Sequence, residues 1–280
     1  MSVPFQLHVT PKRIIRGDLF ASRGKSRGTL IICHGFKGFK DWGMFPYIAT
    51  QLATSLNVMT FNFSHNGIGE ELTAFTELEK FAKNTFSREV EDLAFLVEKI
   101  RAGELLPEYD IEASPLFLLG HSRGGGISLI YALDHPDHVK GVISWNGSVH
   151  LDKMFDEETK AEMREKGRAT IRNARTNQDM PLHVEILDDL ERHKERFNIV
   201  ERVKDAQVPI VLIQGTEDMP ALREGSAQLV RRNSAISWKH IADGNHTFNT
   251  VHPFQGTTEP LEAAIKETKR FIEEQLTPSN

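Results

Sequence analysis

Cysteine is almost absent from the sequence, which has Cys33 alone among its 280 residues. A single thiol cannot form a disulfide within the chain, so the fold cannot depend on one. Cys33 ends the apolar run 29–33, and a cysteine in such a run is more often a small buried side chain than a reactive thiol. We therefore expect Cys33 to be structural.

Long apolar runs are missing as well. No stretch approaches the roughly 18 consecutive apolar residues that a membrane-spanning helix needs, so we predict no membrane span. The opening segment, Met1 to Thr10, lacks the charged start and the long apolar region of a secretory signal peptide. These two absences lead us to expect a cytoplasmic protein.

The sequence also has no excess of positive charge. Lys and Arg number 34 against 39 Asp and Glu, and the formal net charge is −5. This balance offers no basis for predicting nucleic-acid binding, although it does not exclude a locally basic pocket. The overall charge therefore identifies no partner.

The chain does contain short apolar runs that alternate with helical patterns, which is typical of an α/β domain with a mostly parallel sheet. Its length suits a single domain, 1–280, and we find no internal repeat. Alternating apolar and polar positions predict an antiparallel pair of edge strands over 3–10 and 12–21. Further strands are expected over 30–33, 57–63, 115–119, 139–145, 208–214 and 234–241. Helices are expected over 42–56, from a Ser87 cap to 100, from the turn at 122 to 134, and over 221–232 and 259–276.

Two segments interrupt this alternation. Residues 64–85 have no clear period, and we expect a long excursion over one end of the sheet. Residues 148–204 are densely charged and have few strand formers, with helical stretches around 156–176 and 184–197. We predict an all-helical insert here and interpret it as a cap or lid over the site.

A G-x-S-x-G pattern, Gly120 to Gly124, lies between an expected strand and an expected helix. Glycine is needed two residues before and two after the serine because a side chain would collide with backbone in the sharp turn that exposes the serine oxygen. The pattern makes Ser122 the candidate nucleophile. A structural turn serine is the alternative.

A serine hydroxyl needs a base within hydrogen-bond reach and an acid behind that base. Asp218 follows a strand-Gly-x-x pattern, and His246 lies in the loop after the next strand. Loops at the carboxyl ends of parallel strands meet at one sheet edge, so these residues can converge on Ser122. The rival acids are Glu217 and Asp243, and the rival histidines are His240 and His252. The adjacent Ser64 and His65 could mimic a second site, but they lack the elbow.

The order Ser122, Asp218, His246, together with the elbow and the His-Gly-Phe loop at 34–36, resembles the α/β-hydrolase superfamily. The resemblance covers roughly residues 28–147 and 205–276. Within the superfamily the sequence is similar to small esterases of the feruloyl/cinnamoyl-esterase and dienelactone-hydrolase-like groups. It implies that Ser122 is the nucleophile, His246 the base and Asp218 the acid.

The same resemblance implies an oxyanion hole made by the backbone N–H groups of Phe36 and Arg123. The second donor has a physical basis, because a free N–H at a helix start favours a developing negative oxygen. Those esterases more often carry Gln or Met where this chain has Arg123. A structural ion pair is the favoured explanation of its side chain, and binding of a substrate carboxylate is the alternative. His34 and Gly35 are expected to shape the backbone.

We therefore predict a serine hydrolase that cleaves carboxylic esters through an acyl-enzyme on Ser122, acting on a small-molecule acyl ester and needing no metal or organic cofactor. A peptidase or acyltransferase with the same residues is one alternative, and a ligand-binding relative without turnover is another. Six aromatic side chains could line an apolar pocket, although at least half are expected to belong to the core: Phe36, Phe39, Trp42, Phe63, Trp145 and Phe248. The natural substrate and the oligomeric state cannot be inferred from the sequence.

Overall fold

The central sheet has eight strands in the order β1-β2-β4-β3-β5-β6-β9-β10 in the computed structural model, which describes residues 2–109, 111 and 114–277. The strands β1 and β2 are antiparallel, β2 pairs antiparallel with β4, and all other neighbours are parallel. This is the mostly parallel sheet with an antiparallel edge that the sequence predicts. The strands are β1 (Val3–Thr10), β2 (Arg13–Phe20), β3 (Thr29–Cys33), β4 (Asn57–Asn62), β5 (Leu116–His121), β6 (Gly141–Trp145), β9 (Ile210–Gly215) and β10 (Ser237–Ile241).

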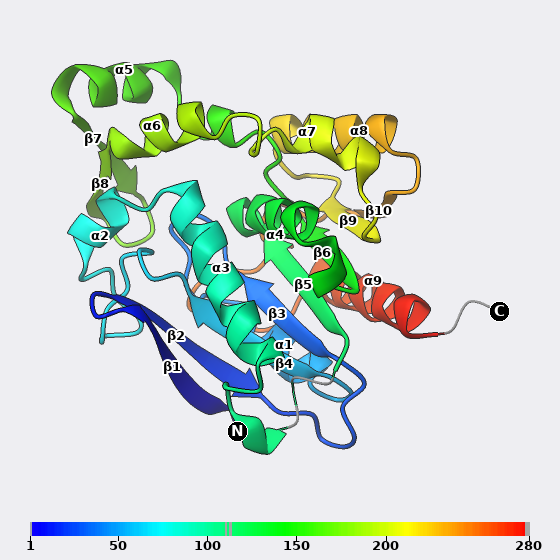
Figure 1. Cartoon of the computed structure of the whole chain (residues 1–280). Coiled ribbons are helices and arrows are strands. Elements are labelled where there is room, and N and C mark those ends of the chain that lie inside the picture. Colours follow the sequence, from blue (N-terminus) through cyan, green and yellow to red (C-terminus); the bar gives the residue numbers. More distant parts are fainter. Residues whose placement is uncertain (1, 110, 112–113, 278–280) are drawn as a thin grey trace.

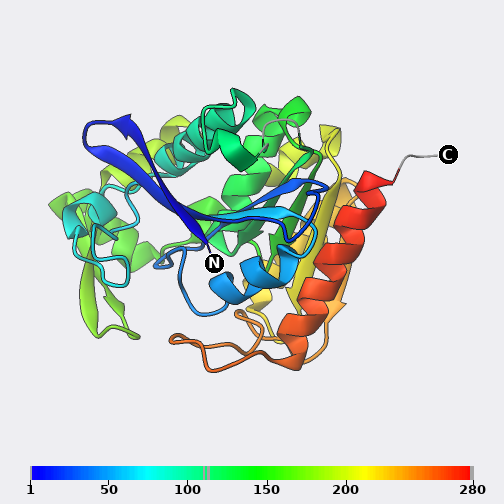
Figure 2. The ribbon, with the colours of Figure 1, turned by 90° about the horizontal axis from the view of Figure 1, so that it is seen from below.

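Helices cover both faces of this sheet. Figure 2 shows α1 and α9 on one side and α3 and α4 on the other. Every residue of β3, β5, β6 and β9 is buried, which explains why these strands are unbroken apolar runs rather than alternating ones. The helices outside the insert are α1 (Phe45–Leu52), α2 (Leu78–Ala82), α3 (Phe86–Arg101), α4 (Arg123–Asp134), α8 (Pro220–Arg232) and α9 (Glu259–Leu276), with the short 3-10 helices η1 (Pro107–Tyr109), η2 (Pro136–His138) and η4 (Val203–Asp205). None of the helices among the described residues is long and apolar enough to cross a membrane.

The start of α3 differs from the prediction by two residues. The cap is Thr85, whose hydroxyl accepts a hydrogen bond from the Arg88 N–H. Ser87 lies inside the first turn and binds Asp189 of the insert instead. Both residues are good caps in sequence, and the tertiary contact of Ser87 decides between them.

Cys33 is fully buried in β3, and burial raises the pKa of its thiol to about 12. A thiol with such a pKa is protonated and unreactive at neutral pH. The structural role expected of Cys33 agrees with this burial.

The segment after β6 is not all helical, so that prediction is wrong. It contains η3 (Leu151–Lys153), α5 (Glu157–Lys166), α6 (Glu185–Arg192) and α7 (Ile199–Arg202), but also an antiparallel hairpin of β7 (Arg168–Asn173) and β8 (Gln178–His183). Gly167, with φ of 74°, ends α5, and exposure then alternates along β7 as in a strand with one buried face. Pro181 within β8 and the surrounding charges hide this pattern in the sequence.

The insert helices lie across the top of the view in Figure 1, together with α8. In Figure 2 the yellow-green hairpin projects at the lower left, on the side where the orange segment after residue 250 also runs. The excursion expected over 64–85 contains α2 and one isolated bridge between Ile68 and Phe75. The hairpin packs on this excursion, because Gln178 donates a hydrogen bond to the Phe75 carbonyl at 3.0 Å.

Candidate active site

The candidate nucleophile occupies a turn that only small neighbours allow. Ser122 stands between β5 and α4 with φ of 55° and ψ of −123°, a conformation that L-residues rarely adopt. A Cβ on Gly120 would lie 2.1 Å from the Gly124 carbonyl oxygen, and one on Gly124 would lie 2.2 Å from the Cys33 carbonyl oxygen. Both glycines are therefore required by close backbone approach, for the physical reason given for the motif.

Ser122, His246 and Asp218 form one chain of hydrogen bonds. The Ser122 Oγ lies 3.0 Å from His246 Nε2, and His246 Nδ1 lies 2.7 Å from Asp218 Oδ1. Asp218 is buried, and its other oxygen accepts a bond of 2.9 Å from Gln214 at the end of β9. A carboxylate at Nδ1 fixes the tautomer in which Nε2 can accept the serine proton, which is the arrangement that activates a hydroxyl.

The rival residues lie elsewhere. His240 is exposed on β10 and packs on Trp238, while the His252 ring accepts a hydrogen bond from the Gly43 N–H. Glu217 is exposed at the surface. Asp243 contributes backbone groups to a turn with Thr216 and Asn249. None of the four bonds to the Ser122–His246 pair within the described part of the chain.

Two side chains that sequence reasoning missed hold the backbone of His246. The His121 Nε2–H donates to the His246 carbonyl at 2.7 Å, and the Asn146 amide donates to the same oxygen at 2.9 Å. Burial lowers the pKa of His121 to about 3, so its ring is neutral. A signal was available, because His121 belongs to the elbow motif and Asn146 follows the expected strand over 139–145.

The expected oxyanion loop lies against the serine. A Cβ on Gly35 would be 2.9 Å from the Ser122 Cβ, so this backbone reaches the nucleophile closely. Neither the Phe36 nor the Arg123 N–H donates a hydrogen bond to another group in the described part of the chain. Two free donors next to a serine suit a developing negative oxygen.

His34 shapes this loop, as expected. Its Nδ1–H donates to the Gly35 carbonyl at 2.9 Å, while Nε2 accepts from the Phe63 N–H at 3.4 Å. Burial lowers the pKa of His34 to about 4, which keeps the ring neutral and able to accept that bond.

The Arg123 side chain is fully buried and points away from solvent. Its Nε donates to Glu89 at 2.7 Å and one terminal nitrogen donates to the Asn84 carbonyl at 3.0 Å. The guanidinium carbon lies 4.0 Å from the Phe86 ring centroid and 5.6 Å from that of Phe36. The favoured explanation, a structural ion pair, agrees with these contacts, and binding of a substrate carboxylate by Arg123 does not.

Ser64 and His65 do form a hydrogen bond, 2.9 Å from Oγ to Nδ1. Ser64 is buried, however, and no carboxylate bonds the second ring nitrogen of His65 among the described residues. Burial and nearby cations lower the pKa of His65 to about 4. A pair whose serine is buried and whose histidine has no orienting acid lacks two requirements for activating a serine.

The cavity at Ser122 is small, about 140 Å³. Of the six aromatic candidates, Phe36 and Trp42 line it, and the other four are buried in the core. The remaining lining residues include Phe45, His121 and two cations that sequence analysis did not identify, Lys37 and Arg175.

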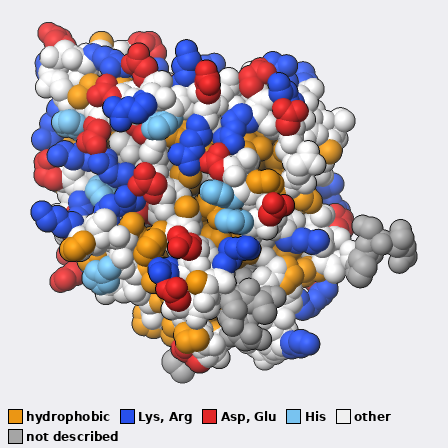
Figure 3. Space-filling model, viewed as in Figure 1, with side chains coloured by type: hydrophobic (Ala, Val, Ile, Leu, Met, Phe, Trp, Pro, Cys, Tyr) orange, Lys and Arg blue, Asp and Glu red, His pale blue; other side chains and the backbone are white. Residues whose placement is uncertain are grey.

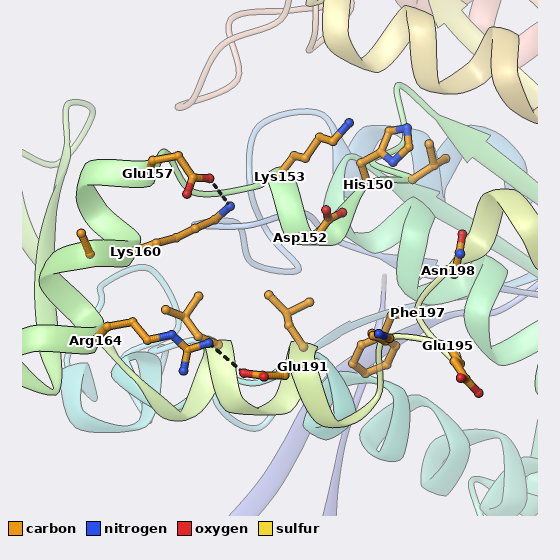
Figure 4. Close-up of a pocket in the computed structure, with 15 residues that line it drawn as sticks. His150, Asp152, Lys153, Glu157, Lys160, Arg164, Glu191, Glu195, Phe197 and Asn198 are labelled. Carbon is orange, nitrogen blue, oxygen red and sulfur yellow. Dashed lines mark hydrogen bonds and ion pairs between the residues drawn. The ribbon is translucent and has the colours of Figure 1, made fainter.

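A larger cavity, about 950 Å³, lies within the insert between α5 and α6. Figure 4 shows its charged lining, in which Lys160 pairs with Glu157 at 2.7 Å and Arg164 with Glu191 at 3.1 Å. In Figure 3 red and blue side chains intermix over this upper part of the molecule. The cavity shares no lining residue with the Ser122 pocket and holds no serine, so we do not place the reaction there.

Two family models match more than half of the chain each. The model described as serine aminopeptidase, S33, matches residues 24–184, and the model named Esterase matches residues 105–266. Monoglyceride lipase of Rattus norvegicus is 29% identical over 120 residues, which is 43% of this chain and 35% of that protein. The Homo sapiens monoglyceride lipase is 27% identical over 149 residues, which is 51% of this chain and 43% of that protein. The chain thus matches less than half the length of these curated relatives.

Solved structures share the fold over nearly the whole chain. Est1E from Butyrivibrio proteoclasticus has a TM-score of 0.70 at 15% identity and covers 98% of each chain. A soluble variant of monoglyceride lipase from Saccharomyces cerevisiae, in complex with a substrate analog, has a TM-score of 0.73 at 16% identity and covers 100% of this chain and 97% of that one. At these identities the likeness concerns the fold, which is the one predicted: an eight-stranded, mostly parallel sheet flanked by helices.

Proposed function

Because the chain belongs to the α/β-hydrolase superfamily, whose esterases and lipases are its distant relatives, we propose that it is a serine hydrolase that cleaves carboxylic esters. The observation that carries the proposal is the bonded series Ser122–His246–Asp218 at a cavity with two free backbone donors. A ligand-binding relative without turnover would have no need for this complete series.

In the proposed reaction His246 takes the proton of Ser122 as Oγ attacks the ester carbonyl. The carbonyl oxygen becomes negative and is stabilised by the N–H groups of Phe36 and Arg123. His246 then returns the proton to the leaving alcohol, and the acyl group remains on Ser122. A water molecule, deprotonated by His246, attacks the acyl-enzyme and releases the acid. Asp218 stays ionised and stabilises the imidazolium at each step.

An aminopeptidase is the second candidate, because one matching family model carries that description. Such an enzyme must accommodate the positive α-amino group of its substrate near the nucleophile. The lining of this pocket includes Lys37 and Arg175, which repel a cation, and no acidic side chain among the described residues lines it. The nearby Asp218 is bonded to His246. The charges therefore favour ester over aminopeptidase chemistry. Comparing amino-acid p-nitroanilides with p-nitrophenyl esters tests this choice, and faster turnover of the anilides would reverse it.

The main test is labelling with a fluorophosphonate probe and hydrolysis of short-chain p-nitrophenyl esters. The native protein should label and turn over, and Ser122→Ala should do neither, with a loss of at least about 10⁴-fold in kcat. Ser64→Ala, which removes the other histidine-bonded serine, is the matched control and should remain active. The proposal fails if the native protein neither labels nor hydrolyses any acyl ester, and Ser122 loses its role if Ser122→Ala keeps full activity.

A further inference from the structure

The tip of the β7–β8 hairpin reaches the mouth of the catalytic pocket. Arg175 lies in the turn between the two strands and lines the cavity that also contains Ser122 and His246. One of its terminal nitrogens donates to the Lys37 carbonyl at 2.7 Å, and its guanidinium carbon lies 5.2 Å from the Trp42 ring centroid. These contacts hold the Arg175 guanidinium at the entrance to the cavity that contains the nucleophile.

Among the described residues, Arg175 has no acidic partner within 4.0 Å, in contrast to its neighbours on the same hairpin. Arg168 pairs with Glu79 at 2.5 Å and Arg172 with Asp179 at 2.6 Å. No carboxylate of the described residues lies within 4.0 Å of the Arg175 or the Lys37 side chain. The pocket mouth therefore has two positive charges that no carboxylate in the described part of the chain pairs with.

Lys37 is half-buried, whereas Arg175 is exposed but lies against the Lys37 carbonyl and the Trp42 ring. Burial lowers the pKa of Lys37, and the charge of Arg175 lowers it further. Burial likewise lowers the pKa of Arg175, although this side chain remains exposed at the hairpin tip. A cation that is partly removed from water and lacks a counter-ion gains free energy when an anion binds beside it.

We propose that the ester cleaved at Ser122 carries a carboxylate, and that Arg175 binds this carboxylate with Lys37 beside it. The inference rests on the proposed function. Arg175 and Ser122 border the same small cavity, so the carboxylate lies within a few bonds of the carbonyl that is attacked. The planar guanidinium fork matches a carboxylate, and a cavity of about 140 Å³ suits a short substrate better than a long acyl chain.

The test compares each anionic ester with the neutral compound in which its carboxylate is methylated, with rates counted per ester bond. Monomethyl glutarate places the carboxylate on the acyl side and acetoxyacetate places it on the alcohol side, with dimethyl glutarate and methyl acetoxyacetate as the neutral partners. We expect at least one anionic ester to exceed its neutral partner in kcat/KM. In Arg175→Gln this preference should fall about 10- to 100-fold through a higher KM, while the neutral esters change less than about twofold.

Arg172→Gln is the matched control, because it removes the same charge from the same hairpin at a residue that already pairs with Asp179. It should keep the preference for the anionic ester. Equal loss in both variants would assign the effect to the overall charge of the hairpin and overturn the role of Arg175.

A binding measurement separates this inference from the proposed function. The same esters are titrated into Ser122→Ala and followed by tryptophan fluorescence, since Trp42 lies in the pocket. Tighter binding of an anionic ester, lost in the double variant with Arg175→Gln, supports the inference without any turnover. If neither anionic ester binds or reacts better than its neutral partner, the inference is overturned. Hydrolysis of neutral esters by the native protein but not by Ser122→Ala would then leave the proposed function intact.

Discussion

Two cavities of the molecule, the insert cavity and the Ser122 pocket, differ most in how their charges are balanced. The insert cavity is the larger by several-fold, but Lys160 and Arg164 in its wall form exposed ion pairs with acidic neighbours. The Ser122 pocket is small. In its lining, His246 is held by the buried Asp218, and Arg175 has no counter-ion among the described residues. The volume of a cavity is therefore a poor indicator of a reactive site. Side chains held by buried partners and charges without counter-ions are better indicators.

The largest difference between the two regions is expected in how much kcat falls when a carboxylate is replaced by its amide. In Asp218→Asn the ring of His246 loses the partner that fixes its tautomer, and kcat should fall about 10⁴-fold. Glu191→Gln, the same kind of change in the insert cavity, should leave kcat within about twofold. Ester hydrolysis with folding checked by circular dichroism gives the comparison, and a comparable loss in both variants would remove the distinction between the cavities.

A smaller contrast concerns stability. Glu89→Gln removes the buried charge that faces Arg123 and leaves the guanidinium uncompensated, so the free energy of unfolding should fall by about 3–5 kcal/mol. Glu191 has 74% of its side chain exposed, and Glu191→Gln should change stability by less than about 0.5 kcal/mol. Urea unfolding measures both. Indistinguishable midpoints would show that the Arg123–Glu89 pair does not support the fold.

The smallest difference is expected in how the free energy of unfolding depends on pH, for the buried His121 and the exposed His240. Burial lowers the pKa of His121 to about 3 from an ordinary value of 6.5, so below pH 6.5 the unfolded chain takes up a proton that the native chain does not. This group therefore makes the free energy of unfolding fall as the pH drops from about 6.5 to 3. In His121→Gln the fall should be shallower, by up to about 1.4 kcal/mol per pH unit. Urea unfolding at pH 7 and pH 5 tests this prediction, with His240→Gln as the exposed control. An unchanged pH dependence in His121→Gln would contradict the burial of His121 as a neutral ring.

The sheet and the serine site could be predicted from the sequence because their signals are local. The apolar runs of β3, β5, β6 and β9 and the glycines around Ser122 reflect burial and steric contact, which leave a mark at each position. The choice of Asp218 and His246 needed only the rule that parallel strands end at one edge. The structure brings both next to Ser122 and leaves His240, His252 and Asp243 apart.

The insert could not be predicted in the same way. Its hairpin is stabilised by packing on the 64–85 excursion and by pairing of β7 with β8, neither of which is visible in a charged segment interrupted by Pro181. For the same reason Arg175 gave no signal, since its importance depends on where a turn lies in space. Sequence reasoning did raise the question of a carboxylate-binding arginine, but for Arg123, which the structure shows to be buried against Glu89. The same chemistry is available at Arg175, which comes from a different element.

The bond between the Arg175 guanidinium and the Lys37 carbonyl has a consequence for how such a protein diverges over evolution. The side chain proposed to bind the substrate comes from an exposed turn, where replacements do not disturb the core. It is held by a backbone oxygen of residue 37 and by the Trp42 ring. The proposed preference for an anionic substrate can therefore change through single substitutions in the hairpin. The turn around Ser122 does not tolerate such substitutions, because a side chain at Gly120 or Gly124 would collide with backbone atoms. If the proposed function holds, selection can thus change which substrate is bound more easily than it can change the reaction at Ser122.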